Sequence, residues 1–556
     1  LPGCLYMTKG LTYFGLGRNI MTSPGANYVL FISAAASYAF KNFVIDGEND
    51  KNICANIYSV GNKTVSWERC MFTRGNTTIY NGQSVETVSF AACVFLGKSA
   101  SATQTFAVFA DQIVNSILAD CMVTSDRDLT FNNNKFLQNN KSICIRPNNT
   151  GVVAIGNVFN YSSGCIIEKA VYTSAKVVNI KYNTFNQGDL TGTAGRAIDI
   201  RGTADLDLSY NTFNSIAGDY AATAQMFVGI LDVVGAELNN NICKSLSEKT
   251  FNHIIIQIGS VTIGACKLNN NYCESASLAG VHFGMLESTA HQLANGTEVK
   301  NNRIIGFKRD NPTGTTTGIH GVLLTAGINM DIRNNYISHH PLGLVVKTGD
   351  QDAYTANGVQ YNIFKDCGTG IYVRGVDALN IFNNTIIHTS AAYTNEFGNG
   401  ILCDENSTNP GCYSENIIIK NNIIISERNA GLLISFDAHA FANGCLCDYN
   451  IYYSPVAKPF HDGTASRTFA EWQALGQDVH SIMLTSMAQV RALFNDYDNG
   501  DYSLKTGGAA IGAGDDLGAD YDDGLDASTT WGSIATLPAI VTKQQGAAWD
   551  CGAYIH

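Results

Sequence analysis

A short motif of polar and apolar positions recurs along the middle of the chain. It consists of an asparagine, a variable residue and a large apolar or aromatic residue, and most copies lie between 22 and 38 residues apart. A repeat of this length predicts a solenoid, in which each copy forms one unit and neighbouring units stack. The copies begin at Asn134, Asn157, Asn183, Asn211, Asn241, Asn271, Asn302, Asn335, Asn362, Asn384, Asn422 and Asn450.

A second motif precedes most of these asparagines. It reads small residue, apolar, any residue, apolar and a variable residue, so its apolar positions are two apart, which is the spacing of a strand and not of a helix. We therefore predict short strands joined by turns and coiled into stacked rungs about 4.8 Å apart. The copies cover residues 142–146, 164–168, 197–201, 280–284, 321–325, 343–347, 370–374, 400–404 and 431–435.

The repeated asparagine is expected to be structural. An asparagine at a corner of the rung can adopt a left-handed conformation more easily than most residues. Its amide can also bond to the asparagines above and below it, which makes a ladder. Upstream, Cys70, Cys93 and Cys121 begin similar motifs, but the 13-residue step from Cys121 to Asn134 is too short for a full turn. The register between residues 100 and 134 therefore stays open.

Together, the two motifs resemble the right-handed parallel β-helix of the pectate-lyase-like superfamily. The resemblance implies an all-β, single-stranded parallel β-helix with an asparagine ladder over residues 1–455. That superfamily includes polysaccharide lyases, glycoside hydrolases, epimerases, phage tailspikes and non-enzymatic surface proteins, so it predicts the fold much more firmly than the function.

After Tyr453 the motifs stop, and residues 456–556 are predicted to form a small C-terminal cap with short helices. Residues 468–475 and 487–493 have helix-forming composition, with Thr468 and Ser486 as candidate N-caps. The later segments 501–504, 509–514 and 549–554 resemble the closing region of uncharacterised extracellular β-helix proteins. This resemblance implies an extracellular, cell-surface or phage-virion location.

Composition and charge limit the classes of partner that the protein is expected to bind. The chain has a formal net charge of −12, and charged residues make up only 15% of it. An acidic chain without basic runs argues against nucleic acid, and no apolar stretch approaches the roughly 20 residues that span a bilayer. The sequence begins without Met or a signal peptide, which is expected of a processed product or a fragment.

The 16 cysteines form no Cys-x-x-Cys pairs, so a zinc site is not predicted. Cys243 and Cys273 occupy the same position in successive repeats, and Cys70 and Cys93 are expected to do likewise, as small apolar core residues. Cys403 and Cys412 bracket a short loop and could close it as a disulfide, a question that spacing alone leaves open.

The third and fifth residues of the strand motif should point outward, where they form columns along the solenoid. Arg146, Glu168 and Arg201 would alternate in sign in one such column, which we interpret as a surface ion-pair ladder of small energetic value.

Further along, Lys347, Arg374 and Asp404 should lie on successive rungs, with Tyr372 beside them. His282 stands at the third position of an earlier copy of the motif. Two stacked cations repel each other, so Asp404, solvent or an anionic ligand must compensate. We also expect a long loop within residues 391–414 to form a wall beside these residues.

In lyases of the resembling superfamily, a Lys or Arg removes the proton next to a uronate carboxylate. That resemblance makes Lys347, Arg374 and Asp404 candidate catalytic residues, and Tyr372 and His282 candidate substrate contacts. The superfamily's known motifs are not found: Gly318-Ile-His-Gly321 departs from the Gly-His-Gly of polygalacturonases, and Asp437-Ala-His-Ala440 departs from the Asp-Pro-His of alginate epimerases.

The tail contains a run of acidic residues, which is a candidate for binding a cation. Ca²⁺ takes several carboxylate and carbonyl ligands at flexible spacing, which such a run could supply. Because the spacing matches no EF-hand loop, we interpret the run as a solvated acidic turn and assign no metal ligand. Its residues are Asp515, Asp516, Asp520, Asp522, Asp523 and Asp526.

Two functions follow from the sequence. In the first, the protein binds polysaccharide, which could be acidic, along its lateral face and cleaves it if it is a lyase or a glycoside hydrolase. In the second, it is a non-enzymatic structural subunit of a surface layer, filament or appendage that self-assembles through its end rungs. Electron micrographs of native material would separate them, because filaments or arrays favour the second.

Overall fold

The structure is a computed structural model that describes most of the chain between Leu5 and His556. For some strand residues that flank the gaps, only the backbone is described. The gaps are residues 8–11, 22–27, 33–36, 47–52, 59–63, 74–76, 83–86, 97–105, 120, 126–127, 140–142, 148–150, 162–164, 188–195, 216–224, 232–234, 246–250, 259–265, 276–280, 288–293, 307–319, 326, 348–356, 390–397 and 406–410.

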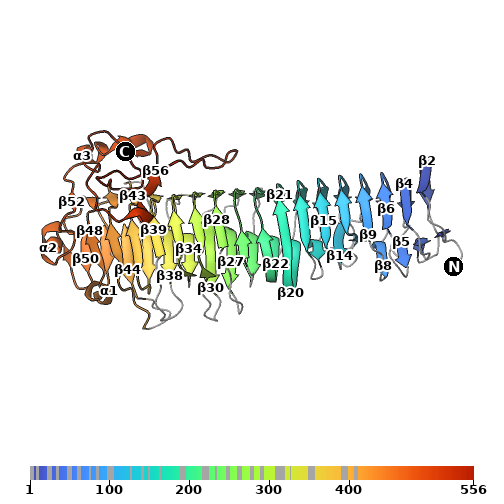
Figure 1. Ribbon diagram of the computed structural model, residues 1–556, viewed down its shortest axis with the longest axis horizontal. Coiled ribbons are helices and arrows are strands. Elements are labelled where there is room, and N and C mark those ends of the chain that lie inside the picture. Colours follow the sequence, from blue (N-terminus) through green and yellow to red (C-terminus); the bar gives the residue numbers. More distant parts are fainter. Residues whose placement is uncertain are drawn as a thin grey trace. The chain divides into compact units, whose positions relative to one another are not determined.

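The chain divides into two compact units, Leu1–Val234 and Gly235–His556, and each is built of parallel strands (Figure 1). The strands of the first unit are β1 (Leu5–Met7), β2 (Thr12–Met21), β3 (Tyr28–Ile32), β4 (Tyr38–Asp46), β5 (Ile53–Tyr58), β6 (Thr64–Glu68), β7 (Met71–Thr73), β8 (Thr77–Gly82), β9 (Thr87–Ala91), β10 (Val94–Leu96), β11 (Phe106–Phe109), β12 (Gln112–Val114), β13 (Ile117–Ala119), β14 (Cys121–Ser125), β15 (Leu129–Asn132), β16 (Lys135–Asn139), β17 (Ile143–Pro147), β18 (Val152–Ile155), β19 (Val158–Tyr161), β20 (Cys165–Lys181), β21 (Thr184–Gln187), β22 (Arg196–Asp207), β23 (Thr212–Ser215) and β24 (Gln225–Leu231).

The second unit continues the same kind of structure. Its strands are β25 (Gly235–Glu237), β26 (Ile242–Ser245), β27 (Phe251–Ile258), β28 (Cys266–Asn269), β29 (Tyr272–Ser275), β30 (Val281–Glu287), β31 (Ala294–Asn295), β32 (Glu298–Lys300), β33 (Arg303–Ile305), β34 (His320–Thr325), β35 (Gly327–Ile328), β36 (Asp331–Arg333), β37 (Tyr336–Ser338), β38 (Leu342–Lys347), β39 (Asn357–Gln360), β40 (Ile363–Lys365), β41 (Thr369–Arg374), β42 (Leu379–Phe382), β43 (Thr385–His388), β44 (Ile401–Asp404), β45 (Ile418–Lys420), β46 (Ile423–Ser426), β47 (Ile434–Phe436), β48 (Leu446–Asp448), β49 (Ile451–Tyr453), β50 (Phe460–Asp462), β51 (Ser466–Arg467), β52 (Ile482–Met483), β53 (Phe494–Asp496), β54 (Asp501–Leu504), β55 (Asp523–Leu525) and β56 (Thr542–Gln544). Its helices are α1 (Ala438–Ala442), α2 (Phe469–Ala474) and α3 (Met487–Arg491), with 3₁₀ turns η1 (Tyr497–Asn499) and η2 (Ala519–Tyr521).

Within each unit, the solenoid strands pair in parallel with their counterparts one turn later, whereas β51 and the tail strands β53–β56 form antiparallel pairs. In the first unit, β7, β10, β13, β16, β19, β21 and β23 form one such sheet. In the second, β38, β41, β44, β47 and β50 belong to another. This is the predicted all-β parallel β-helix. Side chains alternate along the strands, so that Val65 and Trp67 of β6 are buried while Ser66 between them is not.

The predicted asparagine ladder is confirmed, with a corrected register near its start. Within each unit, the Oδ1 atom of a ladder asparagine accepts hydrogen bonds from the backbone N–H and the side-chain Nδ2 of the ladder asparagine one turn earlier. Between Asn157 and Asn183, both distances are 2.9 Å. The open register resolves at Ser116, which takes the ladder position between Cys93 and Asn134, whereas Cys121 begins a different strand. Cys121 was therefore wrongly placed because its motif resembles that of a ladder residue.

The left-handed conformation belongs to the residue before each ladder asparagine and not to the asparagine itself. Asn133, Tyr182 and Asn301 have φ of 56°, 58° and 60°, and each precedes a ladder residue. This corrects the first role that we predicted for the repeated asparagine. The left-handed residue turns the chain at the corner, so that the next side chain points into the core, where the ladder forms.

The glycines of the strand motif are required by close contact between rungs. A Cβ atom on Gly343 would lie 2.5 Å from the carbonyl oxygen of Gly370 and 2.9 Å from a ring carbon of Phe364. A Cβ atom on Gly370 would lie 2.7 Å from the carbonyl oxygen of Gly400. Any larger residue here would push neighbouring turns apart.

The cores are filled by side chains stacked along each unit. Phe136, Phe159, Phe185 and Phe213 stack in the first unit, with ring centres 4.6, 4.9 and 4.8 Å apart. Such pairs add dispersion to the hydrophobic burial of the rings.

The predicted alignment of cysteines between turns is confirmed, whereas the disulfide that the sequence left open is absent at Cys403. Cys243 and Cys273 pair in register, as predicted, and the pairing of Met71 with Val94 aligns Cys70 with Cys93. Cys403 is a buried thiol, so the disulfide that the sequence left open is not formed.

Solenoid strands continue past residue 455, and a buried carboxylate ends the ladder. Strands β50 and β52 pair with β47 and β49. The fully buried Asp478 accepts hydrogen bonds from the Asn450 amide at 3.0 Å, the Trp472 indole at 2.8 Å and the Ser481 hydroxyl at 2.6 Å. The Tyr452 hydroxyl donates one bond shared between the two carboxyl oxygens, at 3.1 and 3.0 Å. The cap of this end is therefore polar at its centre.

The two tail helices begin where the sequence predicted. Thr468 caps α2 in a capping box with Glu471, and Ser486 caps α3, which ends at Arg491, two residues earlier than predicted.

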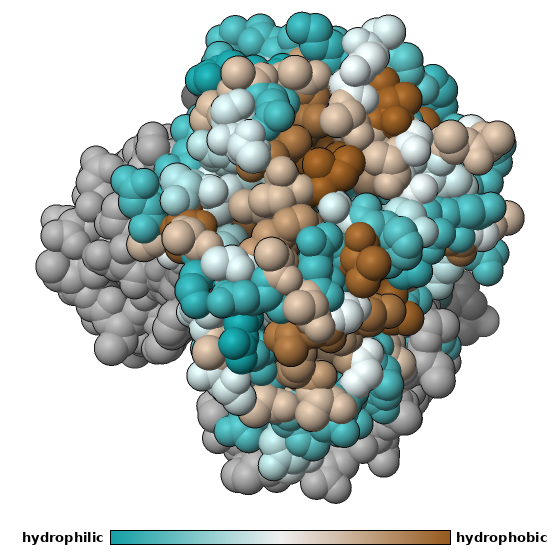
Figure 2. All heavy atoms as spheres, turned by 90° about the vertical axis from the view of Figure 1, so that its left-hand side faces the viewer, coloured by the Kyte–Doolittle hydropathy of each residue, from teal (hydrophilic) through white to brown (hydrophobic). Residues whose placement is uncertain are grey.

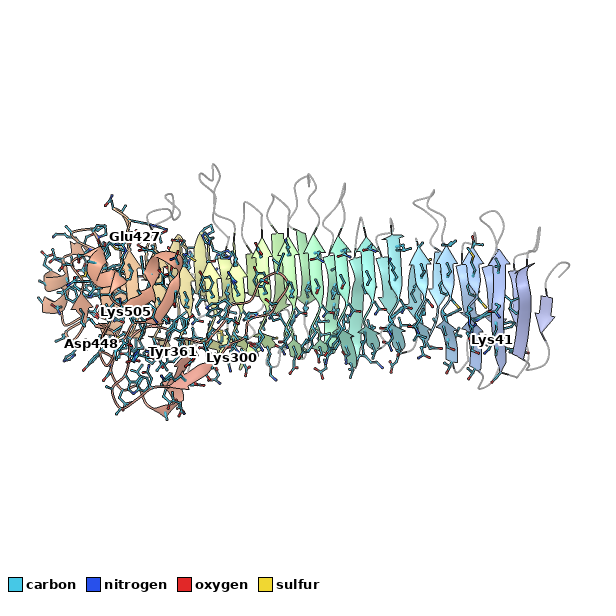
Figure 3. All side chains as sticks on the ribbon, turned by 90° about the horizontal axis from the view of Figure 1, so that it is seen from above. Lys41, Lys300, Tyr361, Glu427, Asp448 and Lys505 are labelled. Atoms are coloured by element: carbon cyan, nitrogen blue, oxygen red, sulfur yellow. The ribbon has the colours of Figure 1, made fainter. Side chains whose placement is uncertain are left out.

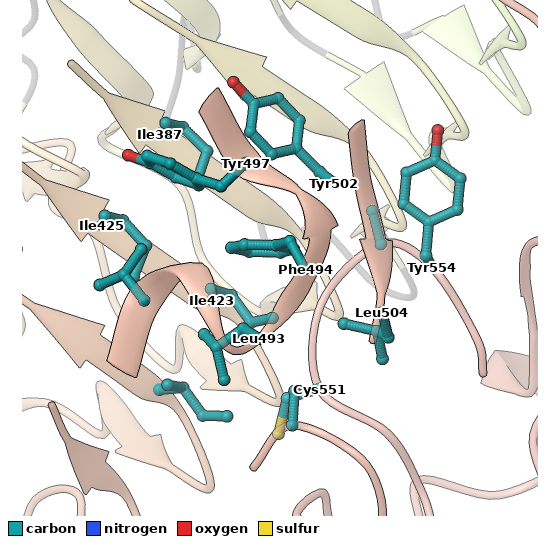
Figure 4. Close-up of a cluster of buried hydrophobic side chains, with 14 of the residues drawn as sticks. Ile387, Ile423, Ile425, Leu493, Phe494, Tyr497, Tyr502, Leu504, Cys551 and Tyr554 are labelled. Carbon is teal, nitrogen blue, oxygen red and sulfur yellow. The ribbon is translucent and has the colours of Figure 1, made fainter. Parts of the chain in front are cut away.

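The last part of the tail covers the side of the second unit in addition to its end. Phe494, Tyr502 and Leu504 pack with Ile387 and Ile423 in a buried cluster (Figure 4). This lateral packing differs from a cap confined to the last rung.

Polar contacts extend along the same side. The Tyr361 hydroxyl donates to the backbone oxygen of Tyr521 at 2.5 Å, close to where Figure 3 shows the tail beside Tyr361. Farther along, Arg303 donates to the backbone oxygen of Gly532 at 2.5 Å, so the tail reaches back across several turns.

The end face that carries α2 mixes polar and apolar side chains (Figure 2). The described apolar side chains exposed in the second unit include Leu446, Leu475 and Val479. Among the residues with described placement, no helix is long and apolar enough to cross a membrane.

Candidate functional site

Four predicted site residues come together on the lateral face of the second unit, on β38, β41 and β44 (Figure 1). Lys347 pairs in register with Arg374, and Arg374 pairs with Asp404. Tyr372 projects from β41 two residues before Arg374. Lys347, Tyr372, Arg374 and Asp404 are named the lateral patch below, and all four are half-buried.

Contacts within the lateral patch link its aromatic, cationic and acidic members. The Tyr372 hydroxyl donates a 2.8 Å hydrogen bond to Asp404 Oδ2, and the Arg374 guanidinium carbon lies 6.0 Å from the centre of the Tyr372 ring. The Asp404 backbone oxygen accepts from Gly375 N and from the buried Ser414 hydroxyl, at 3.0 and 2.8 Å. These backbone bonds fix the strand end from which Asp404 projects.

Asp404 is the electrostatically unusual member. Burial raises the pKa of its carboxyl to about 6, and the nearby Asp437 and Glu405 also act to raise this pKa. The hydrogen bond from Tyr372 and the charge of Arg374 act to lower it, without cancelling the rise. Its Oδ1 atom is shielded from solvent and makes no hydrogen bond. Burial likewise raises the pKa of the Tyr372 hydroxyl. The carboxyl therefore changes charge near neutral pH, at a site that holds two cations.

We expect Asp404→Asn to be more stable than wild type at neutral pH. The folded carboxyl retains a proton that the unfolded chain, with an ordinary pKa of 3.8, has released. The unfolding free energy of wild type should therefore fall by up to about 3 kcal/mol as the pH rises from about 4 to above 6.

In the Asn variant this loss should disappear, while the amide oxygen still accepts from Tyr372. Denaturant unfolding of both proteins across this pH range measures how the free energy of unfolding depends on pH. Equal pH dependence in both proteins would contradict the role of Asp404.

Some predicted columns are corrected by the observed register. Arg201 pairs with Val171 and not with Glu168, because irregularities in β20 and β22 shift the pairing, so the three-charge ladder is broken. His282 lies outside the lateral patch. Phe283 pairs with Val322, which shifts the motif by two residues and aligns Gly284, instead of His282, with the outward third position.

The last copy of the strand motif is also shifted by two residues. Ser435 pairs with Leu402, so that Asp437, and not Ser435, follows Asp404 in the column. Asp437 caps α1 by accepting from Ala440 N at 2.6 Å. Sequence reasoning missed Asp437 because Gly431 resembles a motif glycine, whereas Leu433 occupies that position.

The predicted wall of the lateral patch falls partly on residues outside those that the structure describes. Residues 390–397 and 406–410 lie outside the described residues, and β44 occupies the middle of the predicted loop region. In the tail, Asp515 pairs with Lys420 at 2.8 Å, and Asp526 bonds to Ser528. Across the side chains that the structure describes, no group of three or more His, Cys, Asp or Glu residues could hold a metal ion.

The lateral patch combines groups that suit binding better than bond cleavage. Lys347 and Arg374 can bind carboxylates or sulfates, and Tyr372 offers an apolar ring beside them. Asp404 has one oxygen bonded to Tyr372 and the other shielded from solvent, so neither oxygen is oriented to a substrate. The sequence matches no protein-family profile and no curated protein.

Proposed function

We propose that this protein binds an acidic polysaccharide along the lateral face of its second unit, in an extracellular, cell-surface or virion setting. The observation that carries the proposal is the in-register pairing of Lys347 with Arg374 on adjacent strands. The strands that carry them lie about 4.8 Å apart, so one anionic group of a ligand can contact both cations. A chain of uronate sugars offers repeated carboxylates for such a site.

The rest of the lateral patch supports a sugar ligand over a simple ion. Tyr372 presents a half-buried ring within 6.0 Å of the Arg374 guanidinium carbon, and its hydroxyl is tied to Asp404. Binding sites for small ligands typically combine an apolar surface with a few oriented polar groups. When Asp404 is protonated, the net positive charge of the lateral patch increases, so affinity should rise as the pH falls through about 6.

The test is binding of polygalacturonate and alginate oligosaccharides by calorimetry. A Lys347→Ala/Arg374→Ala variant should lose affinity by about a hundredfold, because two charge-assisted contacts disappear. The matched control is Arg491→Ala/Lys505→Ala, which removes two exposed cations far from the lateral patch in sequence. We expect the control to bind as wild type does, and binding by all to weaken at high salt.

Two outcomes would contradict the proposal. If wild type binds neither glycan, the lateral patch is not a glycan site, and the structural-subunit hypothesis is favoured. If the double variant binds as tightly as wild type while remaining folded, the glycan binds elsewhere. Unsaturated products absorbing in the near ultraviolet, formed by wild type and not by the double variant, would make the site catalytic.

A further inference from the structure

Two exposed tyrosines stack on the corner of the first unit. Tyr182 and Tyr210 immediately precede ladder residues on successive turns, and their ring centres lie 4.9 Å apart at an interplanar angle of 15°. Their exposed fractions are 59% and 44%, the first of which is high for a large aromatic side chain. The corner therefore presents a double-layered aromatic surface.

The backbone conformation makes tyrosine an unusual choice here. Tyr182 and Tyr210 have φ of 58° and 61°, a region that asparagine and glycine adopt more easily than bulky residues. In the second unit, tyrosines at the same turn position are used for packing. Tyr361 is fully buried and bonds to the tail, and Tyr449 stacks on His480 at 4.7 Å. Packing of this kind does not account for the rings of Tyr182 and Tyr210.

The turn before Tyr182 carries no side chain of its own beside the Tyr182 ring. That position is Gly156, with φ of 68°, and the position one turn earlier is Asn133, with φ of 56°. Successive turns lie about 4.8 Å apart, so the absent side chain at Gly156 leaves a step about one ring thick. A Cβ atom on Gly156 would lie 2.5 Å from Asn133 Oδ1, so the exposed Asn133 amide occupies the inner end of this step, against the Gly156 backbone.

The chemistry around the step favours a neutral polar ring. Lys181 next to Tyr182 is paired with Asp207, so the cation is already neutralised. An acidic chain without a basic patch disfavours nucleic acid, whose binding depends on phosphate contacts. The C–H face of a pyranose ring can stack on the negative face of an aromatic ring, while its hydroxyls bond to an amide.

We propose that Tyr182, Gly156 and Asn133 form a binding site for one neutral pyranose ring of a glycan, with Tyr210 supporting Tyr182 from behind. This site lies in the first unit and requires no acidic sugar, so it does not depend on the lateral patch. Tyr182 supplies the stacking face, and the Asn133 amide, which lies against the Gly156 backbone, forms the inner wall and provides the polar contact.

The experiment measures the affinity of cellohexaose, chitohexaose and maltohexaose by calorimetry for wild type and three variants. Gly156→Asn fills the step with the residue that this turn position most often carries, and Tyr182→Asn removes the stacking face while easing the backbone. Each should lower the affinity for the bound hexaose about tenfold or more. Tyr210→Asn leaves the Tyr182 face in place and should lower it only about threefold.

Circular dichroism checks that each variant is folded, and the Lys347→Ala/Arg374→Ala variant should bind the neutral hexaose as wild type does. The proposal is overturned if wild type binds none of the three hexaoses, or if Gly156→Asn and Tyr182→Asn bind like wild type. A wild-type dimer in sedimentation that Tyr182→Asn converts to a monomer would also overturn it, by assigning the surface to self-association.

Discussion

Replacing Asp478 with alanine will lower the free energy of unfolding of the second unit by about 4 kcal/mol or more. The carboxylate is fully buried and accepts from Asn450, Tyr452, Trp472 and Ser481. Alanine would leave these four donors without that acceptor in a low-dielectric environment, and each buried unpaired group costs about 1–3 kcal/mol. Partial relaxation and entry of water keep the total below the simple sum.

The loss should be concentrated at the end of the solenoid. Because solenoid turns contact mainly their neighbours, amide hydrogen exchange in Ile451–Tyr453 and Phe469–Ala474 should accelerate more than exchange in Tyr336–Ser338. Asp478→Asn, which keeps the shape and one acceptor oxygen, should fall between wild type and Asp478→Ala.

Asp520→Ala is the matched control, because it makes the same side-chain change at an exposed tail residue. It should change stability by less than about 0.5 kcal/mol. If Asp478→Ala unfolds at the same denaturant concentration as the control, then Asp478 does not hold the end of the ladder.

Replacing Asn335 with alanine should lower stability by about 3–4 kcal/mol. Asn335 Oδ1 accepts from the Asn302 backbone at 3.0 Å and from its side chain at 2.9 Å. Its Nδ2 donates to Val299 O at 2.7 Å and to Asn362 Oδ1 at 2.9 Å. Alanine removes these bonds, and a further one from Nδ2 to Arg333 O, from a site with no exposed surface, so several neighbours lose one partner at once.

The first unit contains a natural precedent for a milder substitution. At Ser116, a hydroxyl holds the ladder position, accepting from Cys93 N at 3.0 Å and donating to Val114 O at 2.9 Å. Asn335→Ser should therefore lose about half as much stability as Asn335→Ala. Asn429→Ala, at an exposed position, should have little effect, and denaturant unfolding of the three variants orders them. Equal losses for serine and alanine would contradict the ladder interpretation.

The two proposed glycan contacts differ in chemistry and in the unit that carries them. The lateral patch uses paired cations in the second unit and should respond to salt and pH, whereas the tyrosine corner of the first unit is neutral and should respond to neither. Variants confined to one site therefore test the two proposals separately. Failure of acidic glycans at Lys347 and Arg374 would leave the proposal for Tyr182 intact, and the reverse also holds.

Local regularity explains why much of the site could be predicted. The glycines at 343, 370 and 400 are each followed by the same alternation of inward and outward residues. Because neighbouring turns cannot slip without moving these glycines out of contact, counting from each glycine predicts the pairing of Lys347, Arg374 and Asp404. The helix N-caps at Thr468 and Ser486 were predictable for the same reason, since capping depends on residues three positions apart.

The register failed wherever another residue replaced the repeating one. Ser116 takes an asparagine position and Leu433 takes a glycine position, and neither residue has a local signal for these roles. A shift of two residues keeps the inward and outward faces unchanged, so the hydrophobic pattern cannot detect it. Asp437 was missed and His282 was misplaced for this reason, and only the pairing of whole strands corrects them.

The sequence by itself determined the parallel β-helix, its asparagine ladder and the column of the lateral patch, because these depend on spacing that repeats every turn. Only the tertiary structure decided what the tail covers and which polar groups it buries. The contacts of Tyr361 with Tyr521 and of Arg303 with Gly532 join residues 160 and 229 positions apart. Tyr361 is buried by the tail and Tyr182 remains exposed, although both occupy the same turn position. That difference arises from packing between distant segments, which no local pattern records.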